Sequence, residues 1–409
     1  NLWVARILTL LITALALIVF LRKKELRIFA MFLFVITVLE YHIFQFGHYA
    51  MAEVICIDFV MLSLYFYIKT MQAEVLRMRL KSVFLSSLFL FFCYSCKIQF
   101  LYVAVILPLS VLFPAAFRCF KEKRILRNEL KIVLFSGLFT CFFLLVYYLI
   151  WYLPNKEFYQ YVMNSESTGR YPLGIVNIRE VALYNYHNLL CVKAFMPYIL
   201  HFYIILGFAF LFYVFGKRIK SANHYILLFA LIWVLVELHK IPMTYLPNRY
   251  LLSALFGAGA FIAGFYSLII STFRKLKLFV FLILLVSGIY NLDNNWISLN
   301  KRTYQLQTAS NYLAGYNFRN KTILGTWAPS LNWKADAKTL PVWNHYFNWK
   351  DPINTYQPVA VVTEIDEMES DTTYKQQNIN LQRISDSSHV FDVWNSKLVI
   401  YWIKQDSIK

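Results

Sequence analysis

The first 291 residues of the chain consist mainly of apolar runs of about 20 residues, and this pattern restricts the fold more than any other feature. A helix needs about 20 mostly apolar residues to cross the hydrocarbon core of a bilayer. We expect about ten such helices. They are residues 2–21, 28–46, 50–68, 82–96, 98–117, 132–153, 196–215, 224–239, 249–271 and 277–291. The sequence therefore predicts a polytopic α-helical membrane protein.

The overall composition agrees with a membrane protein. Hydrophobic residues make up 59% of the chain, and charged residues make up only 15%. A soluble domain carries about 25% charged residues. The aromatic content of 19% is high, as expected where Phe, Tyr and Trp face lipid and its interfaces.

The short segments between the apolar runs alternate in charge, and every second one is basic. The basic set is Arg22, Lys23, Lys24 and Arg27; Lys69, Arg77, Arg79 and Lys81; Arg118, Lys121, Lys123, Arg124, Arg127 and Lys131; Lys217, Arg218 and Lys220; and Arg274, Lys275 and Lys277. Cytoplasmic loops carry the excess of Lys and Arg. We therefore expect this set to be cytoplasmic, with the amino end and the C-terminal tail on the outer face.

The net charge of +18 does not indicate a nucleic-acid partner. Residues 1–291 hold 28 Lys and Arg against 11 Asp and Glu, whereas residues 292–409 hold 12 against 11. A nucleic-acid-binding protein gathers its basic excess on a folded polar surface. Here the excess lies in hinges between apolar runs, where it determines topology.

Residues 292–409 differ from the rest, and we expect them to form a separate outer-face α+β domain after a transmembrane domain of residues 1–291. The tail holds seven of the ten Trp residues, and short β-rich runs at 359–364 and 398–403 are separated by turn-rich stretches. A long polar loop, residues 154–195, is also predicted on the outer face and contains Arg170. Long loops of this kind often carry function.

The six cysteines all precede residue 292, and they are expected to pack between helices. Cys93 and Cys96 have the spacing of a redox motif but lie in an apolar run. Glu40 and His42, inside the second predicted helix, are expected to pack or pair. The first run has no basic region and no cleavage site typical of a signal peptide, and an outside amino end therefore suggests that one helix and its outer loop precede Asn1.

Ionisable residues inside or at the ends of apolar helices are costly in a bilayer, so they are functional candidates by default. Those toward the outer face are Glu53, Asp58, Lys97, Glu237, His239, Lys240, Arg249 with its neighbour Tyr250, and also His48 and Arg170. Cations can grip a phosphate, and carboxylates can deprotonate a hydroxyl. Such a set at the water–lipid boundary suits a polyprenyl-phosphate-linked substrate.

Simpler interpretations stay open for these residues. Lys97 or Arg249 at a helix end can extend to the lipid headgroups, and Glu53 can be an exposed first-turn carboxylate favoured by the helix dipole. Asp58 lies deeper and can pair with a neighbouring helix without any chemistry. For His48, a place at the membrane interface is favoured over metal binding.

Four stretches, in order along residues 1–270, resemble the GT-C glycosyltransferases, specifically the bacterial relatives of protein O-mannosyltransferases and of the aminoarabinose transferases that modify lipid A. They are Val4-Ala-Arg6-Ile-Leu-Thr-Leu-Leu, Tyr49-Ala-Met-Ala-Glu53, Cys93-Tyr-Ser-Cys-Lys97 and Leu246-Pro-Asn-Arg249-Tyr-Leu-Leu. The resemblance implies that Glu53 is the second acidic residue near acceptor and sugar. It also implies that Lys97 and Arg249, with Tyr250 beside it, bind the phosphate of the donor.

One feature departs from that family. Its primary catalytic carboxylate lies in the first outer loop, which would precede Asn1, so the resemblance places the general base ahead of this sequence. The leading hypothesis is transfer of a sugar from a polyprenyl-phosphate donor to a lipid, glycan or protein acceptor on the outer face of the cell (inner) membrane. A transporter or flippase, and a non-catalytic assembly subunit, are the alternatives. No cofactor follows from the residues, and a divalent cation stays open.

Overall fold

The computed structural model of the 409-residue chain describes residues 2–43, 52–123, 126–157, 159–160, 174–191, 196–215, 222–243, 246, 248–300, 304–332, 334–343, 348–365, 368–393 and 396–404. The chain separates into two compact units. The first comprises Asn1–Lys156 and Arg170–Trp296, and the second comprises Glu157–Gly169 and Ile297–Lys409.

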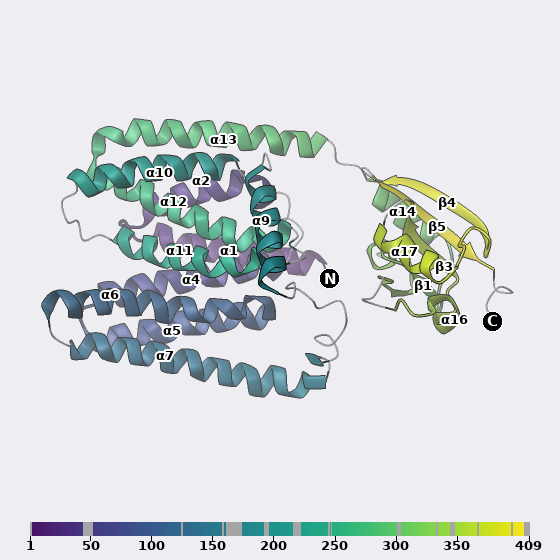
Figure 1. The fold of residues 1–409 in the computed structure, drawn as a ribbon, viewed down its shortest axis with the longest axis horizontal. Helices are drawn as coiled ribbons and strands as arrows, with labels where there is room; N and C mark the ends of the chain where they lie inside the picture. The colour runs from purple at the N-terminus through teal and green to yellow at the C-terminus, as the bar shows by residue number, and fades with distance from the viewer. Residues whose placement is uncertain are drawn as a thin grey trace. The chain divides into compact units, whose positions relative to one another are not determined.

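The first unit consists of long helices, most of which run alongside one another (Figure 1). They are α1 (Leu2–Leu21), α2 (Arg27–Leu39), α4 (Ala52–Gln72), α5 (Leu76–Cys96), α6 (Ile106–Glu122), α7 (Arg127–Tyr147), α9 (Ile175–Cys191), α10 (Met196–Phe215), α11 (Ala222–Glu237), α12 (Leu252–Thr272) and α13 (Lys277–Asn300). Short 3₁₀ or π segments adjoin them: η1 (Ile98–Val105), η2 (Tyr148–Tyr152), η3 (Leu153–Asn155), η6 (Leu238–Lys240), η7 (Asn248–Leu251) and η8 (Arg274–Leu276). Within the described residues, every predicted apolar run overlaps one or two of these elements.

The predicted class of helical membrane protein is confirmed. Within the described residues, six helical stretches are long and apolar enough to cross a membrane. They are Ala52–Gln72, Ile98–Glu122, Arg127–Asn155, Ala222–Lys240, Arg249–Thr272 and Arg274–Ala314, and three shorter apolar helical stretches accompany them: Ile7–Leu21, Arg27–Thr37 and Pro197–Gly207. The chain is therefore a multi-pass membrane protein.

One basic hinge is structured differently from the prediction, because α5 begins at Leu76 and includes residues that we expected to lie outside the helix. The guanidinium of Arg79 is buried and donates to both carboxylate oxygens of Glu129 on α7, at 3.0 and 2.9 Å. Arg118 on α6 donates to the same carboxylate at 2.7 Å and to the Tyr225 hydroxyl at 3.1 Å. Part of the basic excess thus joins α5, α6, α7 and α11 as a buried ion cluster.

Helix α9 lies in the segment that we predicted to be a long polar loop. Figure 1 shows it running across one end of the other helices. Its apolar residues are interspersed with Asn, Arg, Glu and His, and most are exposed, as for Ile175 at 86% and Tyr184 at 68%. A helix with mixed polar and apolar residues can lie in a membrane interface, and this mixture concealed it among the polar loop residues.

Small residues let α12 approach its neighbours closely, as is common where helices pack inside membranes. A Cβ atom on Gly264 would lie 2.9 Å from Cγ2 of Ile226 on α11, and one on Gly257 would lie 3.2 Å from the Trp233 ring. On another side of α12, a Cβ on Gly259 would lie 3.4 Å from Ile36 of α2. The glycines therefore fix the contacts of α12 with α11 and α2.

The second unit contains a five-stranded mixed sheet in the order β2-β1-β3-β5-β4. The strands are β1 (Thr322–Leu324), β2 (Lys338–Leu340), β3 (Ala360–Glu364), β4 (Ser385–Val393) and β5 (Ser396–Ile403). β1 pairs in parallel with β2 and β3, and β5 pairs antiparallel with β3 and β4. The two β-rich runs predicted in the tail correspond to β3 and β5.

Helices cover both faces of this sheet. Successive side chains of a strand point to opposite faces, so neighbouring residues of β3 pack into different cores. Ala360 and Val362 of β3 belong to a core shared with α14 (Gln305–Ala314) and α15 (Ala328–Leu331). Val361 belongs to a second core, shared with α16 (Pro352–Tyr356) and α17 (Met368–Gln376). The unit is thus a three-layer α/β/α arrangement.

Candidate active site

The first element of the site is an ion pair between the start of α4 and the end of α5. Glu53 lies in the first turn of α4, and Lys97 has an extended backbone directly after the last residue of α5. The Lys97 ammonium donates to Oε1 of Glu53, and the side chains are 22% and 6% exposed. Glu53 is therefore a buried carboxylate in an ion pair. It is not the exposed first-turn carboxylate of the simpler interpretation.

The ring of Tyr250 connects this ion pair to a second cation. Tyr250 lies in η7, the 3₁₀ segment that precedes α12. Nζ of Lys97 and Cζ of Arg249 each lie 5.5 Å from the centre of the ring, within the range of a cation–π contact. Nε2 of Gln99 donates to the phenol oxygen at 3.3 Å.

A second buried ion pair lies at the end of α11. The ammonium of Lys240 donates to Oε2 of Glu237 at 2.6 Å and to the Tyr102 hydroxyl at 3.0 Å, and the Tyr102 hydroxyl donates to the other oxygen of Glu237. The side chains of Lys240 and Glu237 are 9% and 1% exposed. The centres of the His239 and Tyr102 rings are 4.6 Å apart.

Tyr250 joins the two ion pairs into one cluster. Its backbone carbonyl accepts a hydrogen bond from Lys240 at 2.9 Å, while its side chain faces Lys97 and Gln99. Seven of the predicted residues are thereby brought to one end of the helices: Glu53, Lys97, Glu237, His239, Lys240, Arg249 and Tyr250. Two others, His48 and Arg170, lie outside the residues that the structure describes.

Asp58 is separated from this cluster. It lies five residues after Glu53 on α4, which places it on a different side of the helix. The hydroxyl of Thr13 on α1 donates to Oδ2 of Asp58 at 2.6 Å. This agrees with the simpler interpretation, in which Asp58 pairs with a neighbouring helix. Glu40 and His42 likewise pair as expected, with Oε1 and Nδ1 3.0 Å apart.

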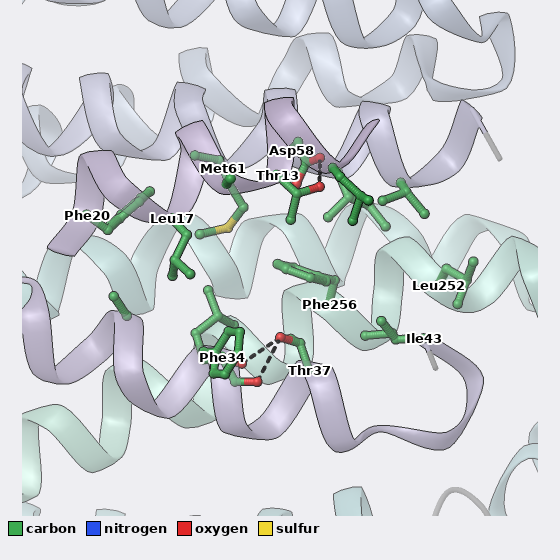
Figure 2. A pocket seen from close by; sticks show the side chains of 17 residues that line it. Thr13, Leu17, Phe20, Phe34, Thr37, Ile43, Asp58, Met61, Leu252 and Phe256 are labelled. Atoms are coloured by element: carbon green, nitrogen blue, oxygen red, sulfur yellow. Dashed lines mark hydrogen bonds between the residues drawn. The ribbon is translucent and has the colours of Figure 1, made fainter. Parts of the chain in front are cut away.

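An apolar cavity of about 360 Å³ lies between α1, α2, α4 and α12. Figure 2 shows Thr13, Asp58, Met61 and Phe256 among the side chains that line it. Two further lining residues are Val54, which follows Glu53, and Leu252, which is the first residue of α12 after η7. The cavity lining therefore includes sequence neighbours of the ion-pair cluster, although no member of the cluster lines it.

The cavity is also open toward the surroundings of the first unit. Leu10 on α1 and Phe34 on α2 both line it, and they are 69% and 48% exposed. Both side chains lie on apolar helices, Ile7–Leu21 and Arg27–Thr37, so apolar side chains surround the opening.

Gln99 and Tyr102 are members of the cluster that the sequence analysis did not identify. Both lie in η1, where a 3₁₀ helix of three residues per turn places positions i and i+3 on one face. Pro108 follows and cannot donate a hydrogen bond to residue 104, which favours a segment that is not α-helical. Two polar residues three apart in an apolar run were the available signal.

No metal centre is evident in the described residues, because no group of three or more His, Cys, Asp and Glu side chains there could hold an ion. The cluster contains nitrogen cations and two carboxylates that they already pair with. These side chains can form charge-assisted hydrogen bonds to an anion.

Neither a protein family nor a curated protein sequence matches this sequence. Solved structures do match it, and two of them are crystal structures of ArnT from Cupriavidus metallidurans, one bound to undecaprenyl phosphate and one in the apo state. The TM-score is 0.52 for both, with 13% and 12% sequence identity. Each match covers 97% of this chain, and 83% and 82% of ArnT. The chain therefore has the fold of ArnT over almost its whole length, which confirms the resemblance to the GT-C glycosyltransferases at the level of the fold.

Proposed function

We propose that this protein is a membrane glycosyltransferase that moves a sugar from a polyprenyl-phosphate donor to an acceptor on the outer face of the membrane. Two observations carry the proposal. Lys97 pairs with Glu53 and, together with Arg249, lies over the Tyr250 ring. An apolar cavity in the same unit includes Val54 and Leu252, which follow Glu53 and η7 in the sequence. A site of this kind has one part for an anion and one for an apolar chain.

The charges of the cluster suit a donor with a phosphodiester. Lys97, Arg249 and Lys240 are cationic, and Glu53 and Glu237 are anionic, so the five side chains carry one positive charge in excess. A phosphodiester supplies one negative charge, and charge-assisted hydrogen bonds from Lys and Arg hold it strongly. The polyprenyl chain then occupies the cavity beside Val54 and Leu252.

The pairing of Lys97 with Glu53 gives the donor a specific role. In the proposed complex, the donor phosphate takes over the Lys97 ammonium, and Glu53 becomes available to accept a hydrogen bond from the hydroxyl of the acceptor. That hydroxyl attacks the anomeric carbon and gives its proton to the general base, while the bond from this carbon to the phosphate oxygen breaks. Lys97 and Arg249 stabilise the leaving phosphate. The carboxylate that the family resemblance places ahead of Asn1, as the general base, stays a prediction.

Lys240 is proposed to position the phosphate ligands rather than to bind substrate. It uses its three donors on Glu237, Tyr102 and the carbonyl of Tyr250. These bonds attach η7, which carries Arg249, to the end of α11. A site must hold its charged groups within a small distance of the productive geometry, and such supporting bonds provide this.

ArnT supports the choice of partner, because its structure was solved with undecaprenyl phosphate bound. By analogy we assign this chain a polyprenyl-phosphate donor, and we place the reaction at the outer face of the cell membrane, where the basic hinges predict the cluster to lie. The acceptor is a lipid, glycan or protein.

The test is transfer by purified protein in nanodiscs supplied with a radiolabelled polyprenyl-phosphate sugar and extracted cell-envelope acceptors. Labelled acceptor is expected with the wild type. Lys97→Ala and Arg249→Ala should each reduce the rate at least about 100-fold, since loss of one charge-stabilising donor costs that much. Lys131→Ala, an exposed lysine on α7, is the matched control and should retain the wild-type rate.

Two outcomes would contradict the proposal. Undiminished transfer in both the Lys97 and the Arg249 variant would exclude the cluster as the donor site. If proteoliposomes instead move the intact lipid-linked sugar across the membrane without cleaving it, the protein is a flippase.

A further inference from the structure

The second unit contains a cleft of about 490 Å³ that takes no part in the proposed transfer. It is formed by the end of β3, by α17 and the turns that follow it, and by β5. Its lining includes Glu364, Tyr374, Lys375, Asn378, Asn380, Gln382 and Tyr401. The volume lies within the range of small-molecule sites, about 300–1,000 Å³.

The turns after α17 present a row of amide side chains to the cleft. From residue 378 to residue 382 the side chains alternate: Asn378, Asn380 and Gln382 are exposed, while Ile379 and Leu381 pack into the core under the sheet. The buried pair anchors the segment, and the amides are left at its surface. An amide offers both donors and an acceptor, so the row can bind several hydroxyl groups.

Backbone hydrogen bonds hold this row in place before any ligand binds. The N–H groups of Asn378 and Ile379 donate to the carbonyls of Lys375 and Tyr374, at 3.1 and 2.9 Å. Asn378 has a φ of 55°, in the left-handed region where a helix commonly ends. A preformed site loses little conformational entropy on binding.

The remaining lining residues limit the kind of ligand. Tyr401 is half-buried and contributes aromatic surface with a polar group, whereas Tyr374 lines the cleft but is only 2% exposed. Lys375 and Glu364 balance each other in charge, which disfavours a phosphate or a nucleic acid, since these need several cations. The abundance of polar groups disfavours a lipid chain. The ligand that combines many hydroxyl groups, an apolar ring face and no charge is a sugar.

Two neighbouring strands contribute to the cleft. Glu364 is the last residue of β3, and Tyr401 lies in β5, which pairs antiparallel with β3.

We propose that this cleft in the second unit binds an uncharged saccharide through Asn378, Gln382 and Tyr401. The proposal rests on residues of the second unit alone. It therefore holds or fails independently of the transferase site in the first unit.

Binding is tested with the full chain in nanodiscs, because common maltoside detergents themselves carry a sugar. The probes are two uncharged disaccharides, maltose and N,N′-diacetylchitobiose, measured by saturation-transfer NMR. Ring-proton signals are expected for at least one of them. The double variant Asn378→Gly/Gln382→Ala should weaken affinity about tenfold, which is the 1.4 kcal/mol that two lost hydrogen bonds supply.

The matched control is Asn320→Gly/Gln305→Ala, which makes the same two changes at an exposed left-handed turn and on α14, away from the cleft. Its affinity for the disaccharide should stay within about twofold of that of the wild type. Glycine suits φ near 55°, so Asn378→Gly preserves the turn, and the unfolding temperature of each variant confirms its fold. Tyr401→Phe, which keeps the ring, should give a smaller loss. Absence of binding by the wild type, or unchanged binding by the double variant, would overturn the proposal.

Discussion

The ammonium of Lys97, where α5 has just ended, donates to the carboxylate of Glu53 in the first turn of α4, and little of either side chain is exposed. This pair brings together two residues 44 positions apart in the sequence. It also means that a phosphate that binds Lys97 must compete with Glu53. The proposed function depends on that exchange, and the pair itself can be tested through stability.

Removing Lys97 alone should destabilise the protein more than removing the whole pair. Lys97→Met leaves the Glu53 carboxylate buried without its cation. For a buried pair this lowers the free energy of unfolding by about 3–5 kcal/mol. The double variant Glu53→Gln/Lys97→Met should recover more than half of that loss. Thermal unfolding in detergent measures both, and a double variant as unstable as the sum of the single variants would contradict the expectation.

Glu53 and Asp58 should differ in their effect on transfer. Glu53→Gln removes the carboxylate that orients the acceptor hydroxyl in the proposed complex, and it should lower the rate about 100-fold, as expected when a reacting group is misplaced. Asp58→Asn keeps an oxygen that accepts from the Thr13 hydroxyl, and its rate should stay within about threefold of the wild type. The comparison uses the nanodisc transfer assay. Equal losses in the two variants would assign Asp58 a catalytic role as well.

Glu129 should be essential for the stability of the first unit, because its carboxylate is shared by two guanidinium groups. Glu129→Gln leaves Arg79 and Arg118 without their anion. It should lower the free energy of unfolding by about 3–5 kcal/mol. Glu74→Gln changes an exposed carboxylate and serves as the control. The midpoint of thermal unfolding reports the difference, and similar midpoints for the two variants would show that the buried cluster contributes little.

Gly264 should tolerate no added side chain. A Cβ at this position would lie 2.9 Å from Ile226, so Gly264→Ala must separate α11 from α12 or shift the isoleucine. Overpacking of this kind costs about 1–3 kcal/mol. Gly137→Ala on α7 has open space within 4 Å and should be neutral or stabilising. Unfolding temperatures of the two variants in the same detergent provide the measurement.

Gly325 should be required for the sheet of the second unit. Its φ is +124°, and a Cβ there would lie 1.9 Å from the carbonyl oxygen of Val362 on β3. Gly325→Ala therefore adds both backbone strain and a clash, which together should lower the free energy of unfolding by at least about 2 kcal/mol. Faster proteolysis within residues 297–409, with the first unit still resistant, is the expected result. An unchanged digestion pattern would argue against it.

The class of the protein followed from the sequence because the bilayer acts on each helix separately. A run of apolar residues such as 249–271 must be buried or face lipid whatever its neighbours are. The described helices of the first unit, except α9, indeed overlap the predicted runs. In the second unit, β3 and β5 were recognisable for a similar local reason, since their β-rich residues are contiguous.

The partners of individual side chains were decided only by the tertiary structure. Local sequence does not distinguish a lysine that extends to headgroups from one that pairs with a buried carboxylate, because the difference depends on which helix packs beside it. Packing placed Glu53 against Lys97 and Asp58 against Thr13, although the two acids are five residues apart on one helix. It also brought Tyr102 and Lys240 into one hydrogen-bonded cluster from segments 138 residues apart. The sequence by itself determined which segments enter the membrane, and tertiary packing decided which charges meet at their end.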